Sequence, residues 1–131
     1  MKYKAFVELV QDRAHLASLD EAVGAARATL TVLGQRLSAG EASNLGAQLP
    51  PEIGRYLHEV EPSGERFGLK EFFERVSKEE AADLPDAVHH ARAVISVLQA
   101  AVSQGEIEDV RAQLPAEYGP LFESGSQGAL A

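Results

Sequence analysis

The sequence predicts an all-α fold, a helical bundle of about eight helices made of two tandem four-helix repeats with a pseudo-twofold relation. Three observations lead to this prediction: an internal repeat, helical spacing of the apolar residues, and turn residues between the helical segments. The 131 residues suffice for one domain with its own hydrophobic core. We therefore expect a single helical domain over 1–122 and a flexible tail at 123–131.

The internal repeat is visible when residues 19–57 are laid on residues 84–122. This shift of 65 positions gives 17 identities in 39 positions, among them the segments Ala-Arg-Ala, Val-Leu, Gly-Glu and Ala-Gln-Leu-Pro. Upstream, the segment at 6–10 matches the segment at 72–76 with a shift of 66. We place repeat one at about 2–60 and repeat two at about 69–122.

Each repeat begins with a short amphipathic helix and continues with a long one. The first helix is expected at about 2–13, where Phe6, Leu9 and Val10 have helical spacing. The long helices should begin near Asp20 and near residues 85–86. We expect them to run to the glycines at positions 40 and 105, because glycine adopts the left-handed conformation that often ends a helix.

Two shorter helices complete each repeat. The third should begin at Glu41 or Glu106, with a carboxylate in the first turn facing the positive end of the helix. It should stop before Pro50 or Pro115, because the residue preceding a proline is disfavoured in helical geometry. The fourth is expected at 51–57 and 116–122.

The long helices carry an apolar arc much wider than a surface helix needs. Polar side chains are confined to a narrow strip, formed by Arg27 and Thr31 in one helix and by His89, Arg92, Ser96, Gln99 and Ser103 in the other. A helix that is apolar nearly all round is packed on more than one side. The two long helices should therefore lie at the centre of the domain, with Leu30 and Ile95 in a shared core.

Composition limits the functions that this chain can have. The absence of cysteine excludes disulfides, thiolate metal sites and cysteine nucleophiles, and agrees with a cytoplasmic location. The net charge of −8 disfavours sequence-independent nucleic-acid binding, which needs Lys and Arg to neutralise phosphates. No apolar stretch approaches about 18 residues, so no membrane-spanning helix is expected.

The repeated motifs resemble a known family. The order Phe-x-x-x-Val, Ala-Val with Ala-Arg-Ala, Val-Leu, Ser-x-Gly-Glu and Gln-Leu-Pro is similar to the bacterial family catalogued as domain of unknown function 2267. The resemblance extends from about Lys2 to Phe122. It implies a small all-helical fold, and it implies no activity and no catalytic residues.

The histidines and the repeated glutamates are the candidate site residues. None of the four histidines has a partner histidine at i+3 or i+4, as a helical metal site requires. His89 is expected on the polar strip, and His90 is expected partly packed between helices. Glu41 and Glu106 fit helix starts better than general bases. We therefore predict no catalytic residue, no metal site and no cofactor.

Five residues remain as possible interaction or groove residues: Arg27, Arg92, His89, Gln48 and Gln113. The two arginines recur at equivalent positions and are expected to bridge a glutamate of their own repeat, although they could anchor an anion. The two glutamines precede Leu-Pro and should bond backbone groups at a helix end, or line a groove.

Three functions are compatible with these observations. The first is a helical protein-interaction or scaffold module that binds an unknown protein partner or itself, suggested by the wide apolar arcs. The alternative is a small-ligand-binding protein with a pocket between the two repeats. The third, nucleic-acid binding through the second and third helices, is disfavoured by the charge. Signature motifs of nucleophilic enzymes, phosphate loops and dinucleotide sites are missing, so the sequence gives no evidence for an enzyme.

Overall fold

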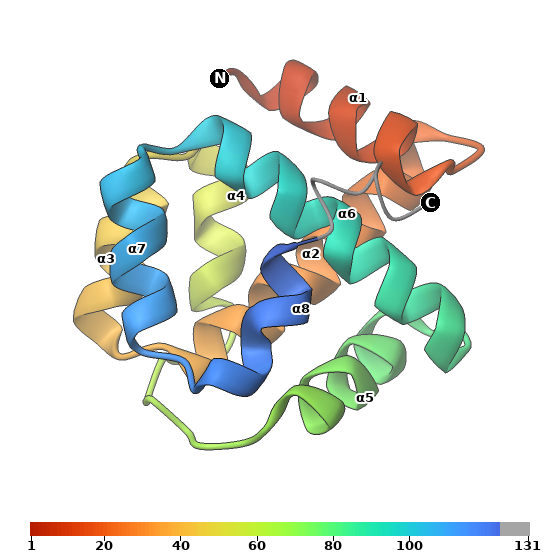
Figure 1. The fold of residues 1–131 in the computed structure, drawn as a ribbon. Helices are drawn as coiled ribbons and strands as arrows, with labels where there is room; N and C mark the ends of the chain where they lie inside the picture. The colour runs from red at the N-terminus through yellow and green to blue at the C-terminus, as the bar shows by residue number, and fades with distance from the viewer. Residues whose placement is uncertain (124–131) are drawn as a thin grey trace.

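The computed structural model describes residues 1–123, and this part of the chain is helical without a β-strand (Figure 1). The expected tail beyond residue 123 lies outside the described residues. The all-α prediction and the number of about eight helices are confirmed for residues 1–123. The elements are α1 (Tyr3–Ala14), α2 (Leu19–Arg36), α3 (Ala39–Ala47), α4 (Pro51–Gly54), a 3-10 turn (Arg55–His58), α5 (Leu69–Glu80), α6 (Leu84–Ala101), α7 (Gln104–Ala112), a 3-10 turn (Ala116–Tyr118) and α8 (Gly119–Phe122).

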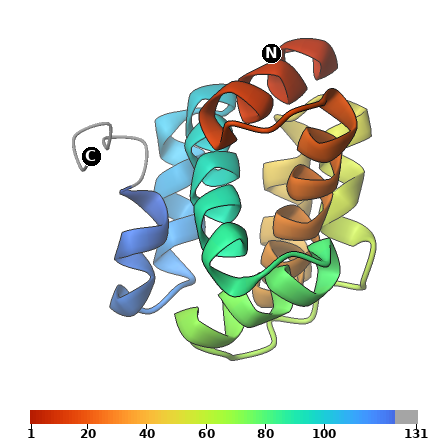
Figure 2. The same ribbon diagram turned by 90° about the vertical axis from the view of Figure 1, so that its right-hand side faces the viewer.

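The two long helices form the centre of the fold. α2 and α6 have 18 residues each and lie side by side, with α1 across one end of the pair and α5 across the other (Figure 2). Leu30 of α2 and Ile95 of α6 are fully buried in one hydrophobic core. The wide apolar arcs are therefore used inside the fold, because each long helix packs against several neighbours.

The predicted glycine ends of the long helices are wrong. α2 ends at Arg36, and Gly40 lies inside α3 rather than after α2. The hydroxyl of Ser38 accepts the backbone N–H of Glu41 at 3.2 Å, so the next helix begins before the glycine is reached. Left-handed backbone instead ends the two short amphipathic helices, at His15 (φ 55°) and at Ala81 (φ 58°). These two residues are 66 positions apart, the shift that relates α1 to α5.

Two members of the predicted polar strip are buried. Thr31 is only 4% exposed and Ser96 only 6% exposed. Their hydroxyls are satisfied inside the fold, because Thr31 Oγ1 donates to the carbonyl of Tyr56 at 3.4 Å and Ser96 Oγ accepts from Arg13 Nη1 at 3.0 Å. The exposed polar strip is therefore narrower than predicted, because neighbouring helices cover these short polar side chains as well as the apolar ones.

Candidate functional site

The candidate site lies where the first turns of α3 and α7 meet. The two helices pack against each other at one side of the molecule (Figure 1). Each begins with the same four-residue pattern, Ser-x-Gly-Glu, and each serine caps its own helix. The hydroxyl of Ser103 accepts the backbone N–H of Glu106 at 3.1 Å, as Ser38 does for Glu41 at 3.2 Å.

The two helix starts are also capped from the opposite helix. The backbone N–H of Ser38 donates to Gln113 Oε1 at 3.0 Å, and the backbone N–H of Ser103 donates to Gln48 Oε1 at 2.8 Å. Gln48 is the C-cap residue of α3, and Gln113 is the C-cap residue of α7. Because the end of each helix touches the start of the other, α3 and α7 run antiparallel.

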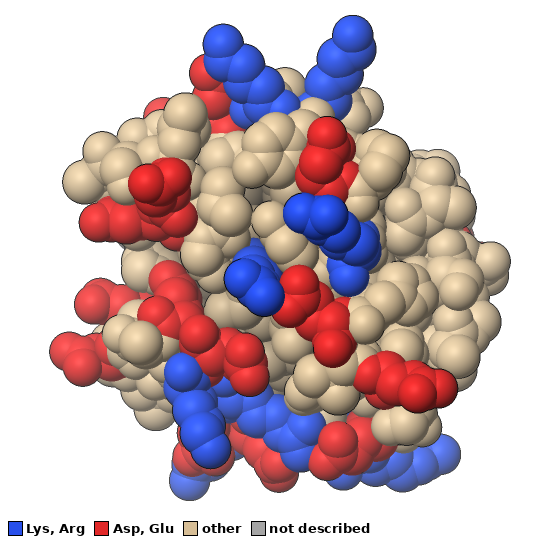
Figure 3. Space-filling model, turned by 180° about the vertical axis from the view of Figure 1, so that it is seen from behind, with Lys and Arg blue, Asp and Glu red and all other residues tan. Residues whose placement is uncertain are grey.

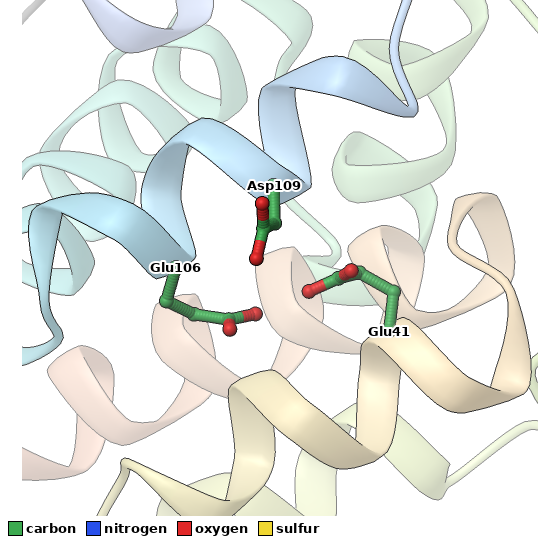
Figure 4. Close-up of side chains that lie close together, drawn as sticks. All are labelled: Glu41, Glu106 and Asp109. Carbon is green, nitrogen blue, oxygen red and sulfur yellow. The ribbon is translucent and has the colours of Figure 1, made fainter.

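This exchange of caps changes the position of the two glutamates. In the usual capping box, the glutamate three residues after the serine reaches back to the serine N–H. Here the glutamine of the other repeat takes that donor, so Glu41 and Glu106 are free to turn into the seam between the helices. Both are buried, with 9% and 6% of their surface exposed, and they face each other in Figure 4.

Asp109 completes a cluster of three carboxylates. It lies one turn after Glu106 on α7 and points into the same space (Figure 4). One carboxylate oxygen from each of Glu41, Glu106 and Asp109 lies within 4.8 Å of the others. Asp109 is exposed, whereas the Oε2 atoms of both glutamates are buried and have no hydrogen-bond partner among the described residues.

The electrostatics of the cluster are unfavourable for three negative charges. Burial, the facing carboxylate of Glu41 and the charge of Asp109 together raise the pKa of Glu106 to about 7. Burial is the largest of these causes. The positive ends of α3 and α7 favour carboxylates nearby, but they do not supply hydrogen-bond partners to the two orphaned oxygens. The cluster can therefore take up a proton or a cation.

The structure places the other predicted site residues in different contacts. Arg27 bridges Glu59 at 2.8 Å within repeat one, which confirms the predicted bridge for this arginine. Arg92 is half-buried on α6. His89 is exposed and stacks on His15 at the end of α1, with 5.8 Å between ring centroids. These three residues do not belong to the carboxylate cluster.

His90 is partly packed between helices, as the sequence predicted. Its Nδ1 lies 2.5 Å from Glu80 Oε2 and so joins α6 to the end of α5. Burial raises the pKa of Glu80, and the hydrogen bond and charge of His90 oppose this shift. The pair joins α5 to α6 through Glu80 Oε2, while Glu80 Oε1 is buried without a hydrogen-bond partner among the described residues.

Two surface hollows are each lined by one repeat only. One, of about 310 Å³, is open and lies on α1 and the turn after it, beside Glu8, Asp12 and His15. The other, of about 70 Å³, lies between α7 and the 3-10 turn before α8. Neither is a pocket between the repeats.

Sequence reasoning did not find the carboxylate cluster. The sequence predicts helix starts at Glu41 and Glu106, but α3 begins at Ala39 and α7 at Gln104, so both glutamates lie in the first turn of their helices. The missing signal was the combination of a capping-box pattern with a repeated glutamine. A glutamine of the opposite helix can replace the glutamate as the acceptor of the serine N–H. The glutamate of the capping box is then left without its usual partner.

One protein-family model matches most of the chain. The model of the family described as uncharacterized conserved protein DUF2267 matches residues 3–121, so the chain belongs to this family. No curated protein matches the sequence. Within residues 1–123, none of the helices combines the length and apolar character needed to cross a membrane.

Proposed function

We propose that this member of the DUF2267 family is a helical binding module that holds a cationic group at the seam between α3 and α7. One observation carries the proposal: Glu41 and Glu106 are buried face to face, and each has an oxygen atom without a hydrogen-bond partner in the described chain. A buried charge without a partner is strongly destabilising, so native proteins pair such groups or neutralise them. A cation at the seam would satisfy both carboxylates.

The proposal includes a tandem duplication with a pseudo-twofold relation between the repeats. Its support is the reciprocity of the seam: Ser38 with Gln113, and Ser103 with Gln48, are the same contact made in both directions. An axis between α3 and α7 would exchange these two contacts and would bring Glu41 opposite Glu106. The shared site would then lie close to the axis.

The proposal includes an interaction or scaffold role only for partners that carry a cationic group. The apolar arcs that suggested it are buried in the core, and only four large apolar side chains are more than about two-fifths exposed in residues 1–123: Met1, Leu19, Val60 and Leu84. A protein partner would therefore be held by a Lys or Arg side chain entering the seam rather than by a broad apolar patch. The cationic group belongs either to such a partner or to a free ion.

The surface charge supports the binding of a cationic group by this chain. On the face shown in Figure 3, Lys and Arg side chains are mixed with Asp and Glu and do not form a continuous basic surface. With a net charge of −8, the chain attracts cations rather than nucleic acid. The proposal places the module in the cytoplasm, in keeping with a sequence that has no cysteine.

The test is a thermal-shift panel on the full chain after treatment with a chelator. Wild type and the double variant Glu41→Gln/Glu106→Gln are heated with Na⁺, Mg²⁺, Ca²⁺, spermidine or an oligolysine peptide. At least one cation should raise the Tm of the wild type by about 3 °C or more and leave the double variant unchanged. Glu74→Gln, which removes an exposed carboxylate on α5, is the matched control and should behave as wild type. Equal shifts for wild type and the double variant with every cation would refute the proposed function.

Self-association is the second candidate, favoured by one observation. Leu19 and Leu84 are equivalent residues at the starts of α2 and α6, and they are 44% and 42% exposed. A second copy of the chain could cover both. Light scattering should then show a dimer in the wild type and a monomer for Leu19→Ser/Leu84→Ser. A monomeric wild type would remove this candidate.

A further inference from the structure

We infer that the cationic group at the seam is a hard divalent cation of about the size of Ca²⁺, chelated by Glu41, Glu106 and Asp109. This inference rests on the proposed function and names its ligand. It has two independent supports: the three carboxylates converge on one space, and two of them are more than nine-tenths buried and aim an unpartnered oxygen into it (Figure 4).

The chemistry of the donors selects the class of ion. All three ligands are carboxylates, and oxygen donors are preferred by Ca²⁺, Mg²⁺ and Mn²⁺ rather than by the softer transition metals. Among the described residues, no histidine belongs to the cluster. A site of this kind should therefore discriminate against ions that need nitrogen or sulfur ligands.

The spacing of the donors is compatible with an ion of the size of Ca²⁺, and the flexible coordination of this ion favours it. No two of the three oxygen atoms are more than 4.8 Å apart. Two oxygens on opposite sides of Ca²⁺ are separated by about 4.6–5.2 Å, since each Ca–O bond measures about 2.3–2.6 Å. Mg²⁺, with bonds of about 2.0–2.1 Å, demands near-octahedral geometry and keeps several of its water molecules, so three carboxylates from two separate helices suit Ca²⁺ better.

Burial distinguishes an ion from a partner's side chain. The Oε2 atoms of Glu41 and Glu106 are covered by the protein, and only Asp109 opens to solvent. A lysine or arginine of another protein would have to carry a long aliphatic stem past Asp109 to reach both glutamates. An ion needs no such passage and can keep water molecules as its remaining ligands on the exposed side.

The repeat suggests where the site could be strengthened. Asn44 follows Glu41 by three residues on α3, as Asp109 follows Glu106 on α7, and both are exposed. Residues three apart share one face of a helix, which brings Asn44 to the same side as Glu41. Asn44→Asp would then add a fourth carboxylate at the rim of the seam and should tighten binding.

The experiment is isothermal titration calorimetry on the chelator-treated full chain, with CaCl₂, MgCl₂ and MnCl₂ in separate runs. We expect one Ca²⁺ per chain, bound with Kd of about 10⁻⁴–10⁻³ M, and weaker Mg²⁺ binding. Glu106→Gln and Asp109→Asn should each weaken Ca²⁺ binding at least about tenfold, and Asn44→Asp should strengthen it several-fold. Glu74→Gln should leave the affinity unchanged, and circular dichroism checks that each variant is folded.

Two results would overturn the inference. One is Ca²⁺ binding of equal strength in wild type and Glu106→Gln, which would place the ion elsewhere. The other is the absence of any divalent binding by a folded wild-type chain. If spermidine or oligolysine nevertheless raised the Tm of the wild type and not that of Glu41→Gln/Glu106→Gln, the divalent ion would be excluded while the cation-binding function survived.

Discussion

The two repeats attach their last helical element to the long helix in different ways. In repeat one, Gly34 of α2 lies directly against the backbone of Leu57, so that a Cβ atom at position 34 would be 2.0 Å from the Leu57 carbonyl oxygen. In repeat two, the equivalent residue is Gln99, whose Nε2 donates to the carbonyl of Phe122 at 2.9 Å. Phe122 is the counterpart of Leu57. The same joint is a backbone contact in one repeat and a side-chain hydrogen bond in the other.

This difference shows which parts of the repeat can change independently. A joint inside one repeat needs to fit only its own neighbours, so glycine and glutamine are both workable at the same position. The seam between α3 and α7 is built from both repeats at once, and there the serine, glutamate and glutamine are identical in the two halves. We expect substitutions at the first kind of contact to affect stability only, and those at the second kind to affect binding as well.

The largest effect is expected from Gly34→Ala. The added methyl group would meet backbone atoms of Leu57, which cannot rotate away as a side chain would, and we expect a loss of at least about 3 kcal/mol in the free energy of unfolding. Chemical denaturation measures this loss. Gly24→Ala is the matched control on the same helix, because nothing lies within 4 Å of its Cβ position, and it should gain about 0.5–1 kcal/mol.

A smaller effect is expected from Glu106→Gln in the presence of a chelator. Because the pKa of Glu106 is raised to about 7 from an ordinary 4.5, its contribution is fully present below about pH 4.5 and is lost as the pH rises towards 7. The glutamine at position 106 of the variant carries no charge at any pH. It should therefore match wild type near pH 5 and exceed it by on the order of 2 kcal/mol at pH 8. A wild type that is the more stable protein at pH 8 would show that the acid is not strained by its surroundings.

Substitution of Gln48 or Gln113, which cap the start of the opposite helix, should have a modest effect on stability and a separate effect on binding. Gln113 makes two bonds to Ser38, to its backbone N–H and from Nε2 to its Oγ at 3.1 Å, whereas Gln48 makes one bond to Ser103. Gln113→Ala should cost about 1 kcal/mol, and Gln48→Ala about half as much, in urea unfolding.

Neither glutamine is a ligand in the proposed site, but each keeps a glutamate in it. In Gln113→Ala, the freed Ser38 N–H would draw Glu41 back into an ordinary capping box. Calorimetry should then show weaker Ca²⁺ binding, although all three carboxylates are still present. An affinity equal to that of wild type would mean that Glu41 is held in the seam by other contacts.

Much of the fold could be predicted because the signals are local and repeated. The apolar spacing of residues 19–37 and 84–102 predicted two central helices, and Leu30 and Ile95 are indeed buried. The helix ends were less predictable. A glycine after a helix suggested a left-handed cap, but Ser38 began the next helix first. The competition between two capping residues depends on the path of the chain, which no local pattern specifies.

The candidate site could not be predicted, because it depends on contacts between residues that are 55 or more positions apart. Ser38 and Gln113 are separated by 75 residues, and the sequence does not show that they meet. Without that contact, Glu41 and Glu106 are ordinary members of two capping boxes. The available signal was the repeated pair of motifs, Ser-x-Gly-Glu and Gln-Leu-Pro.

The smallest effect is expected at position 89, where repeat two has a histidine and repeat one has Gly24. Partial desolvation lowers the pKa of His89, and the charges of His90 and His15 lower it further, whereas a hydrogen bond to the backbone of Ala14 and the charge of Asp86 oppose the shift. A lowered pKa means that the folded protein favours the neutral ring, so any contribution to stability is present above about pH 6.5 and is lost as the pH falls through the folded pKa.

An NMR titration should place the pKa of the His89 imidazole below 6.5, the ordinary value for histidine. His15→Ala should raise it, because this variant removes a stacked ring and a like charge together, while His58→Ala, on a 3-10 turn of repeat one, should leave it unchanged. A His89 pKa at or above 6.5 in the wild type would show that the hydrogen bond and Asp86 outweigh its two histidine neighbours.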